Sequence, residues 1–147
     1  MDMDRIILTA FFATSLMTVF SYSYSAIRKK QYREPDLLNI LLSRLYFGKT
    51  FTITHSSPGW IIHYFIGLLF IVAYFLLWNV LEIEPSLLNC FILGALSGVL
   101  GIVGWGIVFR LHPYPPTINY REFYLQLLIA HIVFGIGTYL SILLLSR

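Results

Sequence analysis

The sequence predicts an all-α integral membrane protein built as a bundle of four transmembrane helices. Hydrophobic residues make up 58% of the 147 positions and charged residues only 12%, with a mean hydropathy of +0.77. That is more apolar surface than a soluble domain of this length can bury. Four stretches reach the roughly 20 residues that a helix needs to cross a bilayer. We therefore expect a single transmembrane domain over 1–147.

Each of the four predicted spans is free of Lys, Arg, Asp and Glu. The spans are 6–27, 59–81, 87–109 and 123–145. The first could be mistaken for a secretory signal, but its head, MDMDR, is acidic and it lacks a convincing small-x-small cleavage site. We expect it to stay as a permanent helix.

The starts of the later spans carry recognisable signals. Ser57 with Pro58 is expected to cap and open the second span, and Pro85 is expected in the first turn of the third. Asn119 and Glu122 have the spacing of a capping box at the fourth.

The connection between the first two spans contains an amphipathic segment at 36–47, DLLNILLSRLYF. Asp36, Asn39 and Ser43 share one helical face, and leucines cover most of the rest. The segment is too short to span and follows a basic stretch, so we predict a helix lying in the cytoplasmic interface. Packing on the end of the bundle, or docking of a partner, fits the pattern equally well.

The basic residues predict the orientation. Of the ten Lys and Arg, six lie between the first and second spans and two flank the connection between the third and fourth. Because such residues stay on the cytoplasmic side, we expect both termini outside, in the periplasm of a bacterial cytoplasmic membrane. The net charge of +3 is therefore a topology signal, and no motif accompanies it that would indicate nucleic-acid binding.

Two spans share a His-x-x-x-Gly pattern, His63 with Gly67 and His131 with Gly135. Each follows a span rich in small residues and a basic loop. The repeated pattern thus predicts two tandem helical hairpins that run in the same direction through the membrane.

Small residues mark the faces where helices touch, because apolar burial does not drive helices together in lipid. The third span has Gly94, Ser97, Gly98 and Gly101 on one face, with Gly94 and Gly98 forming a GxxxG. The first span carries a comparable stripe. Its members are Ala10, Thr14, Thr18, Ser21 and Ser25. We expect these faces to pack within one chain, with a homo-oligomer or a membrane-protein partner as the alternative.

An ionisable side chain inside a membrane indicates function by default. From the helical rise, His131 should lie about 15 Å along its helix and His63 about 5 Å along its own. The residues expected to line a polar, ligand-binding interior are His131, His63, Gln126, Tyr74, Tyr139 and Ser97. A purely structural alternative is a neutral His131 bonded across the bundle to Ser97, Thr138, Tyr74 or Gln126, with His63 meeting water near the headgroups.

Haem b is one candidate cofactor. Two neutral imidazoles are common axial ligands, and a glycine one turn away makes room for a flat macrocycle. The expected difference in depth between His63 and His131 argues against ligation by both, but leaves His131 as a single ligand. The lone Cys90 excludes an internal disulfide and a cysteine-based zinc site.

Transport is another candidate, with a polar track for protons or a small solute. Its members would be His131, Gln126, Tyr139, Ser141 and Asn79. Against it, no Asp or Glu lies in any span, and four helices normally have to oligomerise to enclose a pathway.

An enzyme acting on lipids would need a nucleophile or a metal set. Candidates near the cytoplasmic face are His63, His112, Glu122, Tyr120 and Arg110. They show neither metal-ligand spacing nor a glycine elbow, and the proline-rich 110–122 segment is explained as well by a rigid loop closing the bundle. We therefore expect a non-catalytic membrane component. It would bind a partner, a lipid or a small ligand through its polar interior and basic cytoplasmic face.

Overall fold

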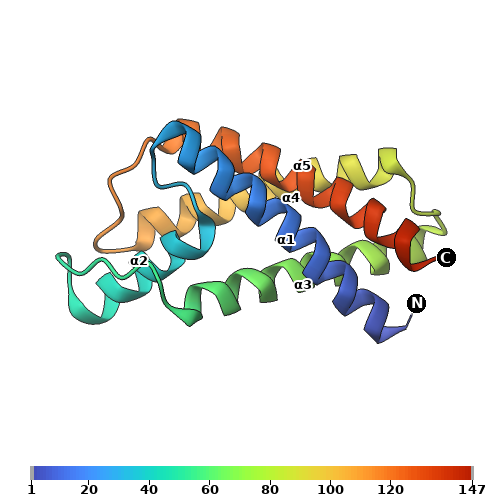
Figure 1. Cartoon of the computed structure of the whole chain (residues 1–147), viewed down its shortest axis with the longest axis horizontal. Helices are drawn as coiled ribbons and strands as arrows, with labels where there is room; N and C mark the ends of the chain where they lie inside the picture. The colour runs from blue at the N-terminus through green and yellow to red at the C-terminus, as the bar shows by residue number, and fades with distance from the viewer. Residues whose placement is uncertain (1, 147) are drawn as a thin grey trace.

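The computed structural model describes residues 2–146, and these form five helices (Figure 1). They are α1 (Met3–Arg28), α2 (Glu34–Phe47), α3 (Ser57–Leu81), α4 (Leu87–Leu111) and α5 (Tyr120–Leu145). All except α2 are long and apolar enough to cross a membrane. The predicted all-α bundle of four spans with a short extra helix is confirmed.

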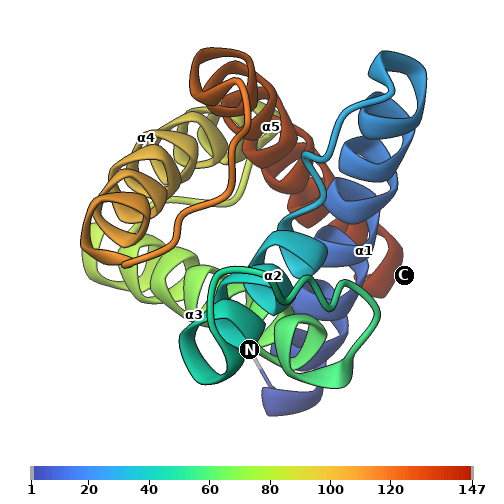
Figure 2. The ribbon, with the colours of Figure 1, turned by 90° about the vertical axis from the view of Figure 1, so that its left-hand side faces the viewer.

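The four long helices lie side by side, and both termini lie at one end of the bundle (Figure 1). Helix α5 packs closely against α4 and α1, α1 also packs against α3, and α2 packs against α3. Helices α3 and α4 are joined by a short connection, yet they are not among the closely packed pairs. Close packing therefore runs from α4 through α5 and α1 to α3, and the contact between α3 and α4 is loose. Figure 2 shows the same bundle end-on.

Glycines explain why α4 and α5 approach so closely. A Cβ on Gly94 would lie 2.6 Å from the carbonyl oxygen of His131, and one on Gly135 would overlap the carbonyl oxygen of Cys90. Both obstacles are backbone atoms, which a side-chain rotation cannot clear. Hydrogen atoms in place of side chains at these two positions let the two backbones touch.

Helix α1 turns its small-residue stripe into the bundle. Its buried residues are Thr9, Ala10, Ala13, Thr14, Met17, Thr18, Ser21 and Ser25. Polar members of the stripe find partners on other helices: the Ser141 hydroxyl of α5 donates to Thr9 Oγ1 over 3.1 Å. The stripe therefore supplies both close approach and hydrogen bonds between helices.

Helix α2 begins two residues earlier than predicted and turns its polar face toward the protein. Asp36, Asn39 and Ser43 are all buried, whereas Tyr46 and Phe47 are exposed. Arg33 lies before the helix and Pro35 in its first turn, where a proline without an N–H loses no hydrogen bond. The structure has the helix packed on the end of the bundle, which is one of the three arrangements considered for this segment.

Asn39 ties α2 to the start of α3. Its Oδ1 accepts hydrogen bonds from Gly59 N and Ser56 Oγ, each over 2.7 Å, and its Nδ2 donates to the carbonyl oxygens of Thr54 and Ser56. The N-cap residue of α3 is Ser56, one before the predicted Ser57, and its hydroxyl does not cap the helix. An asparagine from another helix satisfies the first turn instead.

The other two helix starts also differ in detail from the predictions. Pro85 precedes the N-cap of α4, Ser86, whose hydroxyl accepts from Asn89 N. At α5, Asn119 Oδ1 accepts from Glu122 N over 3.1 Å, as predicted. The Glu122 carboxylate completes no capping box, because it is paired with Arg28 and Lys30.

The proline-rich connection between α4 and α5 holds the other end of α2. His112 Nε2 donates to the carbonyl oxygen of Leu41 over 2.9 Å, since His112 Nδ1 accepts from Tyr114 N. Arg44 donates to the carbonyl oxygens of Tyr114 and Pro115. Helix α2 is thus fixed from both sides at the end of the bundle opposite the termini.

Candidate functional site

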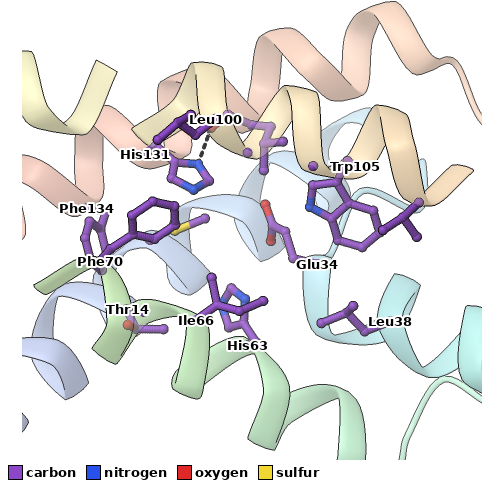
Figure 3. Close-up of a pocket in the computed structure, with 16 residues that line it drawn as sticks. Thr14, Glu34, Leu38, His63, Ile66, Phe70, Leu100, Trp105, His131 and Phe134 are labelled. Carbon is purple, nitrogen blue, oxygen red and sulfur yellow. Dashed lines mark hydrogen bonds between the residues drawn. The ribbon is translucent and has the colours of Figure 1, made fainter. Parts of the chain in front are cut away.

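A cavity of about 320 Å³ lies between α3 and α4, with its inner wall formed by α1, α2 and α5. Figure 3 shows the side chains around it. They are Thr14, Met17, Glu34, Leu38, His63, Ile66, Gly67, Phe70, Leu100, Gly101, Gly104, Trp105, Val108, Leu127, His131 and Phe134. Most of this lining is apolar. The cavity occupies the space that the loose contact between α3 and α4 leaves in the bundle.

The cavity opens to the outside of the bundle between α3 and α4. Ile66, Leu100 and Val108 line it and are also 41%, 62% and 42% exposed. Gly104 lies on the same side, and a Cβ at this position would meet no described atom within 4 Å apart from its own turn of α4. A molecule entering here would pass between apolar side chains that face away from the bundle.

Glu34 is the carboxylic acid at the inner end of the cavity. It comes from the first turn of α2 and is only 2% exposed. Its Oε1 accepts hydrogen bonds from Ser21 Oγ over 2.8 Å and from Gln126 Nε2 over 3.2 Å. Its Oε2 is buried without a hydrogen-bond partner among the described residues. Burial raises the pKa of the Glu34 carboxyl to about 7, against the smaller lowering effect of these hydrogen bonds.

His131 has a defined tautomer. Its Nδ1 lies 2.9 Å from the carbonyl oxygen of Leu127, and a carbonyl only accepts, so Nδ1 carries the proton. In the neutral ring, Nε2 is then a bare acceptor, and it faces Gly101 of α4, which also lines the cavity. The ring packs edge-on to Phe70 with centroids 5.7 Å apart. The expected bonds from His131 across the bundle are wrong, because the imidazole uses its own helix.

His63 is held by α1. Its Nε2 lies 2.9 Å from Thr18 Oγ1, and the Thr18 hydroxyl donates to the carbonyl oxygen of Thr14 over 2.7 Å. Since a hydroxyl has one proton, His63 Nε2–H is the donor and Nδ1 is the unprotonated nitrogen. His63 is 7% exposed, so the expectation that it meets water near the headgroups is wrong.

The other predicted interior residues have different positions. Tyr74 and Ser97 join α3 to α4 through a hydroxyl–hydroxyl bond of 2.7 Å, away from the cavity lining. Gln126 is completely buried behind Glu34. Tyr139 is half-buried, and Asn79 of the proposed transport track is exposed. The structure therefore brings His63, His131 and Glu34 together and leaves Tyr74, Ser97 and Tyr139 outside.

The predicted packing glycines divide into two groups. Gly67 and Gly101 line the cavity, whereas Gly94, Gly98 and Gly135 lie in the contact between α4 and α5. In each hairpin the His-x-x-x-Gly helix turns both residues toward the preceding long helix. His63 and Gly67 meet Thr18 and Thr14 of α1, and His131 and Gly135 meet Gly98 and Cys90 of α4.

The hydrogen bonds of the candidate ligands and catalytic residues count against the haem and enzyme alternatives. Both histidines line one cavity, but Nε2 of His63 is already bonded to Thr18, so axial ligation through that atom would require breaking the bond. Within residues 2–146, no three His, Cys, Asp or Glu side chains are grouped so as to hold a metal ion. Of the enzyme candidates, the Tyr120 hydroxyl donates to the Pro116 carbonyl and Glu122 is paired with two cations.

The sequence analysis missed Glu34. It stands in a basic connection directly before Pro35, where an acidic residue is ordinary at a helix start. The only hint is that Glu34 and Asp36 are the two acids of an otherwise basic segment. Comparison with known proteins adds no candidate residue, since no family model, curated protein or solved structure matches the chain significantly.

Proposed function

We propose that this protein is a non-catalytic membrane component that binds one lipid-soluble molecule in the cavity between α3 and α4. The observation that carries the proposal is an apolar cavity that opens sideways and has unpartnered polar atoms at its inner end. A lateral mouth between two spans admits molecules dissolved in the bilayer. The polar end then orients them, as a few placed polar groups do in most ligand pockets.

The size of the cavity favours a slender ligand. Ligand pockets typically measure about 300–1,000 Å³, and this one, at about 320 Å³, is at the lower limit. One acyl or isoprenoid chain with a compact head fits such a volume better than a two-chain phospholipid. Because such a ligand enters from the bilayer and not from water, the chain gains close packing against Phe70, Leu100 and Phe134, and the polar end of the cavity supplies the selectivity.

The proposal includes an orientation. The α2 end of the bundle carries the basic residues of the first loop and the two arginines that flank the 112–119 connection, Arg110 and Arg121. We therefore propose that this end faces the cytoplasmic side of a bacterial membrane, with both termini outside. Single cysteines introduced at exposed Lys49 and Glu82, in a Cys90→Ser background, would test this. A membrane-impermeant maleimide added to intact cells should label position 82 and spare position 49. The reverse pattern would refute the orientation.

Photolabelling tests the binding proposal. The probe is hexadecanol carrying a diazirine in its chain, added to proteoliposomes and mapped by peptide mass spectrometry. Adducts are expected on the α3 and α4 segments that line the cavity, and excess unlabelled hexadecanol should compete them away. Gly104→Phe should reduce this labelling about tenfold, because the phenyl ring occupies the open space beside Gly104.

The matched control is Val103→Phe. Val103 is the neighbouring residue, 53% exposed and outside the cavity lining, so the same ring is added to the outer face of α4. Labelling should stay at the wild-type level. Equal labelling of the two variants, or adducts spread evenly over all exposed helix faces, would overturn the proposal.

Proton movement is a second candidate, favoured by one observation. The sequence offered no carboxyl within a span, but α2 places Glu34 inside the bundle beside two imidazoles of the same cavity. Intramembrane carboxyl and imidazole groups form proton relays in transporters. Proton flux into proteoliposomes that is lost in Glu34→Gln would support this candidate, and flux equal to that of empty liposomes would exclude it.

A further inference from the structure

We infer that the ligand of this cavity carries a neutral hydroxyl head, which donates to His131 Nε2 and accepts from the Glu34 carboxyl. The inference rests on the proposed function and names its ligand class: a long-chain or isoprenoid alcohol, including the hydroxyl of a reduced ring. It follows from the two polar groups at the inner end of the cavity, His131 Nε2 and the Glu34 carboxyl, and from the lack of Lys and Arg among the described residues that line it.

Charge excludes an anionic head. The described residues that line the cavity include one carboxyl and two imidazoles, but no Lys or Arg. The basic residue nearest in sequence to Glu34 is Arg33, whose guanidinium is paired with Asp36 and lies over the Tyr22 ring, outside the cavity lining. Arg28 and Lys30 are paired with Glu122. A phosphate or carboxylate placed here would lose its hydration and gain no cation, at a cost of several kcal/mol. Phospholipids and ionised fatty acids are therefore poor ligands.

Hydrogen-bonding capacity selects among neutral heads. His131 Nε2 can only accept, because Nδ1 holds the proton of the ring. Glu34 Oε2 is the carboxyl oxygen left free by Ser21 and Gln126, so a protonated Glu34 donates from that atom. A hydroxyl has one donor and two acceptor lone pairs and satisfies both groups. A ketone, ester or ether only accepts, and it would leave the His131 lone pair unmatched.

The two polar groups point into one common space. The His131 ring and the Glu34 carboxyl both point into the space between the helices, from α5 and α2 (Figure 3). Trp105 and Leu38 lie on the α4 and α2 side of the same space. An ammonium head would also find acceptors here, but it would carry a full charge past Leu100, Phe70 and Val108, which offer no compensation.

The experiment compares four photoprobes with one hexadecyl chain and diazirine position: the alcohol, its methyl ether, the acid and the amine. Competition curves are measured on full-length protein in proteoliposomes at pH 7. The alcohol is expected to bind about three- to tenfold more tightly than the ether, the difference that one donated hydrogen bond makes. The acid and the amine should bind more weakly than the alcohol.

Two variants test which side chains recognise the hydroxyl of the ligand. His131→Leu removes the acceptor and should bring the alcohol down to the level of the ether. Glu34→Gln keeps a donor of the same size at the position of Oε2, so it should retain the preference for the alcohol. If His131→Leu does not fold, as judged by its circular dichroism and gel-filtration profile, the alcohol-to-ether ratio of the wild type still decides.

The outcomes distinguish a failure of the hydroxyl assignment from a failure of the proposed function. Equal affinity for alcohol and ether, or a preference for the acid or the amine, overturns the hydroxyl assignment while leaving a cavity that binds amphiphiles. Labelling that is insensitive to Gly104→Phe for all four probes overturns the proposed function itself. A preference for the alcohol that persists in His131→Leu refutes the role given to His131.

Discussion

The two halves of α4 use glycine in opposite ways. Toward the start of the helix, Gly94 and Gly98 press against α5, and a Cβ there would lie 2.6 Å from the His131 carbonyl oxygen and 2.8 Å from Leu128. Toward its end, a Cβ on Gly104 would meet nothing described within 4 Å. The same residue type closes the bundle in one half and leaves space in the other. A small-residue stripe therefore indicates contact only where a second backbone approaches it.

The difference depends on the neighbours of α4. In the first half, α5 brings its own Gly135 to the contact, so two glycines meet. In the second half, α5 presents His131 and Leu127, and α3 presents Ile66 and Phe70. These larger side chains hold the helices apart, and α2 fills the end of the gap with Glu34. The cavity is thus a product of mismatched side-chain size between α3, α4 and α5.

The largest effect is expected from Gly135→Ala, which should disrupt the close contact of α5 with the first half of α4. The added methyl would overlap the Cys90 carbonyl oxygen, and backbone can yield only by separating α4 from α5. Overpacking typically costs about 1–3 kcal/mol, and a clash with backbone belongs at or above the upper end of that range. Denaturant unfolding in detergent micelles should show a large fall in stability or no folded protein. Wild-type stability would refute the close backbone contact on which the comparison depends.

The next largest effect is expected from a change of pH, because the Glu34 carboxyl is buried at the inner end of the cavity beside the second half of α4. Because the folded-state pKa of this carboxyl is raised to about 7 from 4.5, the folded protein holds the proton more tightly than the unfolded chain. Stability should therefore be full at pH 4.5, fall as the pH rises through 7, and level off above it. The total loss should be on the order of 3 kcal/mol.

Unfolding midpoints at several pH values from 5 to 8 measure this dependence, and Glu34→Gln supplies the control. His63 and His131 face the same cavity and are unchanged in the variant, so the difference between the two curves isolates Glu34. Parallel curves would show that the carboxyl is not buried as described.

The contrast between the halves also marks what the sequence could predict. The spans were predictable because each is a long window without charge, and predicted 59–81 and 87–109 differ by two residues from α3 and α4. The contact at Gly94 and Gly98 was predictable from the GxxxG spacing. The cavity was not, since the separation of α3 from α4 depends on several side chains of different helices. Glu34 was missed because a local pattern cannot show that α2 folds back into the bundle.

A smaller effect is expected when the contact between α2 and the start of α3 is weakened. Asn39→Ala removes the acceptor for Gly59 N and the donors to Thr54 and Ser56. Loss of a helix cap costs about 0.5–2 kcal/mol, and the 49–55 segment should become more susceptible to protease. The control is Asn89→Ala, an asparagine in the first turn of α4, whose side chain donates to the Glu84 carbonyl. It should change stability by only a few tenths of a kcal/mol.

The smallest effect, and the sharpest test of the comparison, comes from Gly104→Ala. A methyl group fits the open space there, and alanine favours the helix over glycine by up to about 1 kcal/mol. The variant should therefore be slightly more stable than the wild type, whereas Gly94→Ala, ten residues earlier on the same stripe, should be less stable. Both are measured by denaturant unfolding in the same detergent. If the two substitutions shift stability in the same direction, the two halves of α4 do not differ as described, because a methyl group can stabilise only where no backbone opposes it.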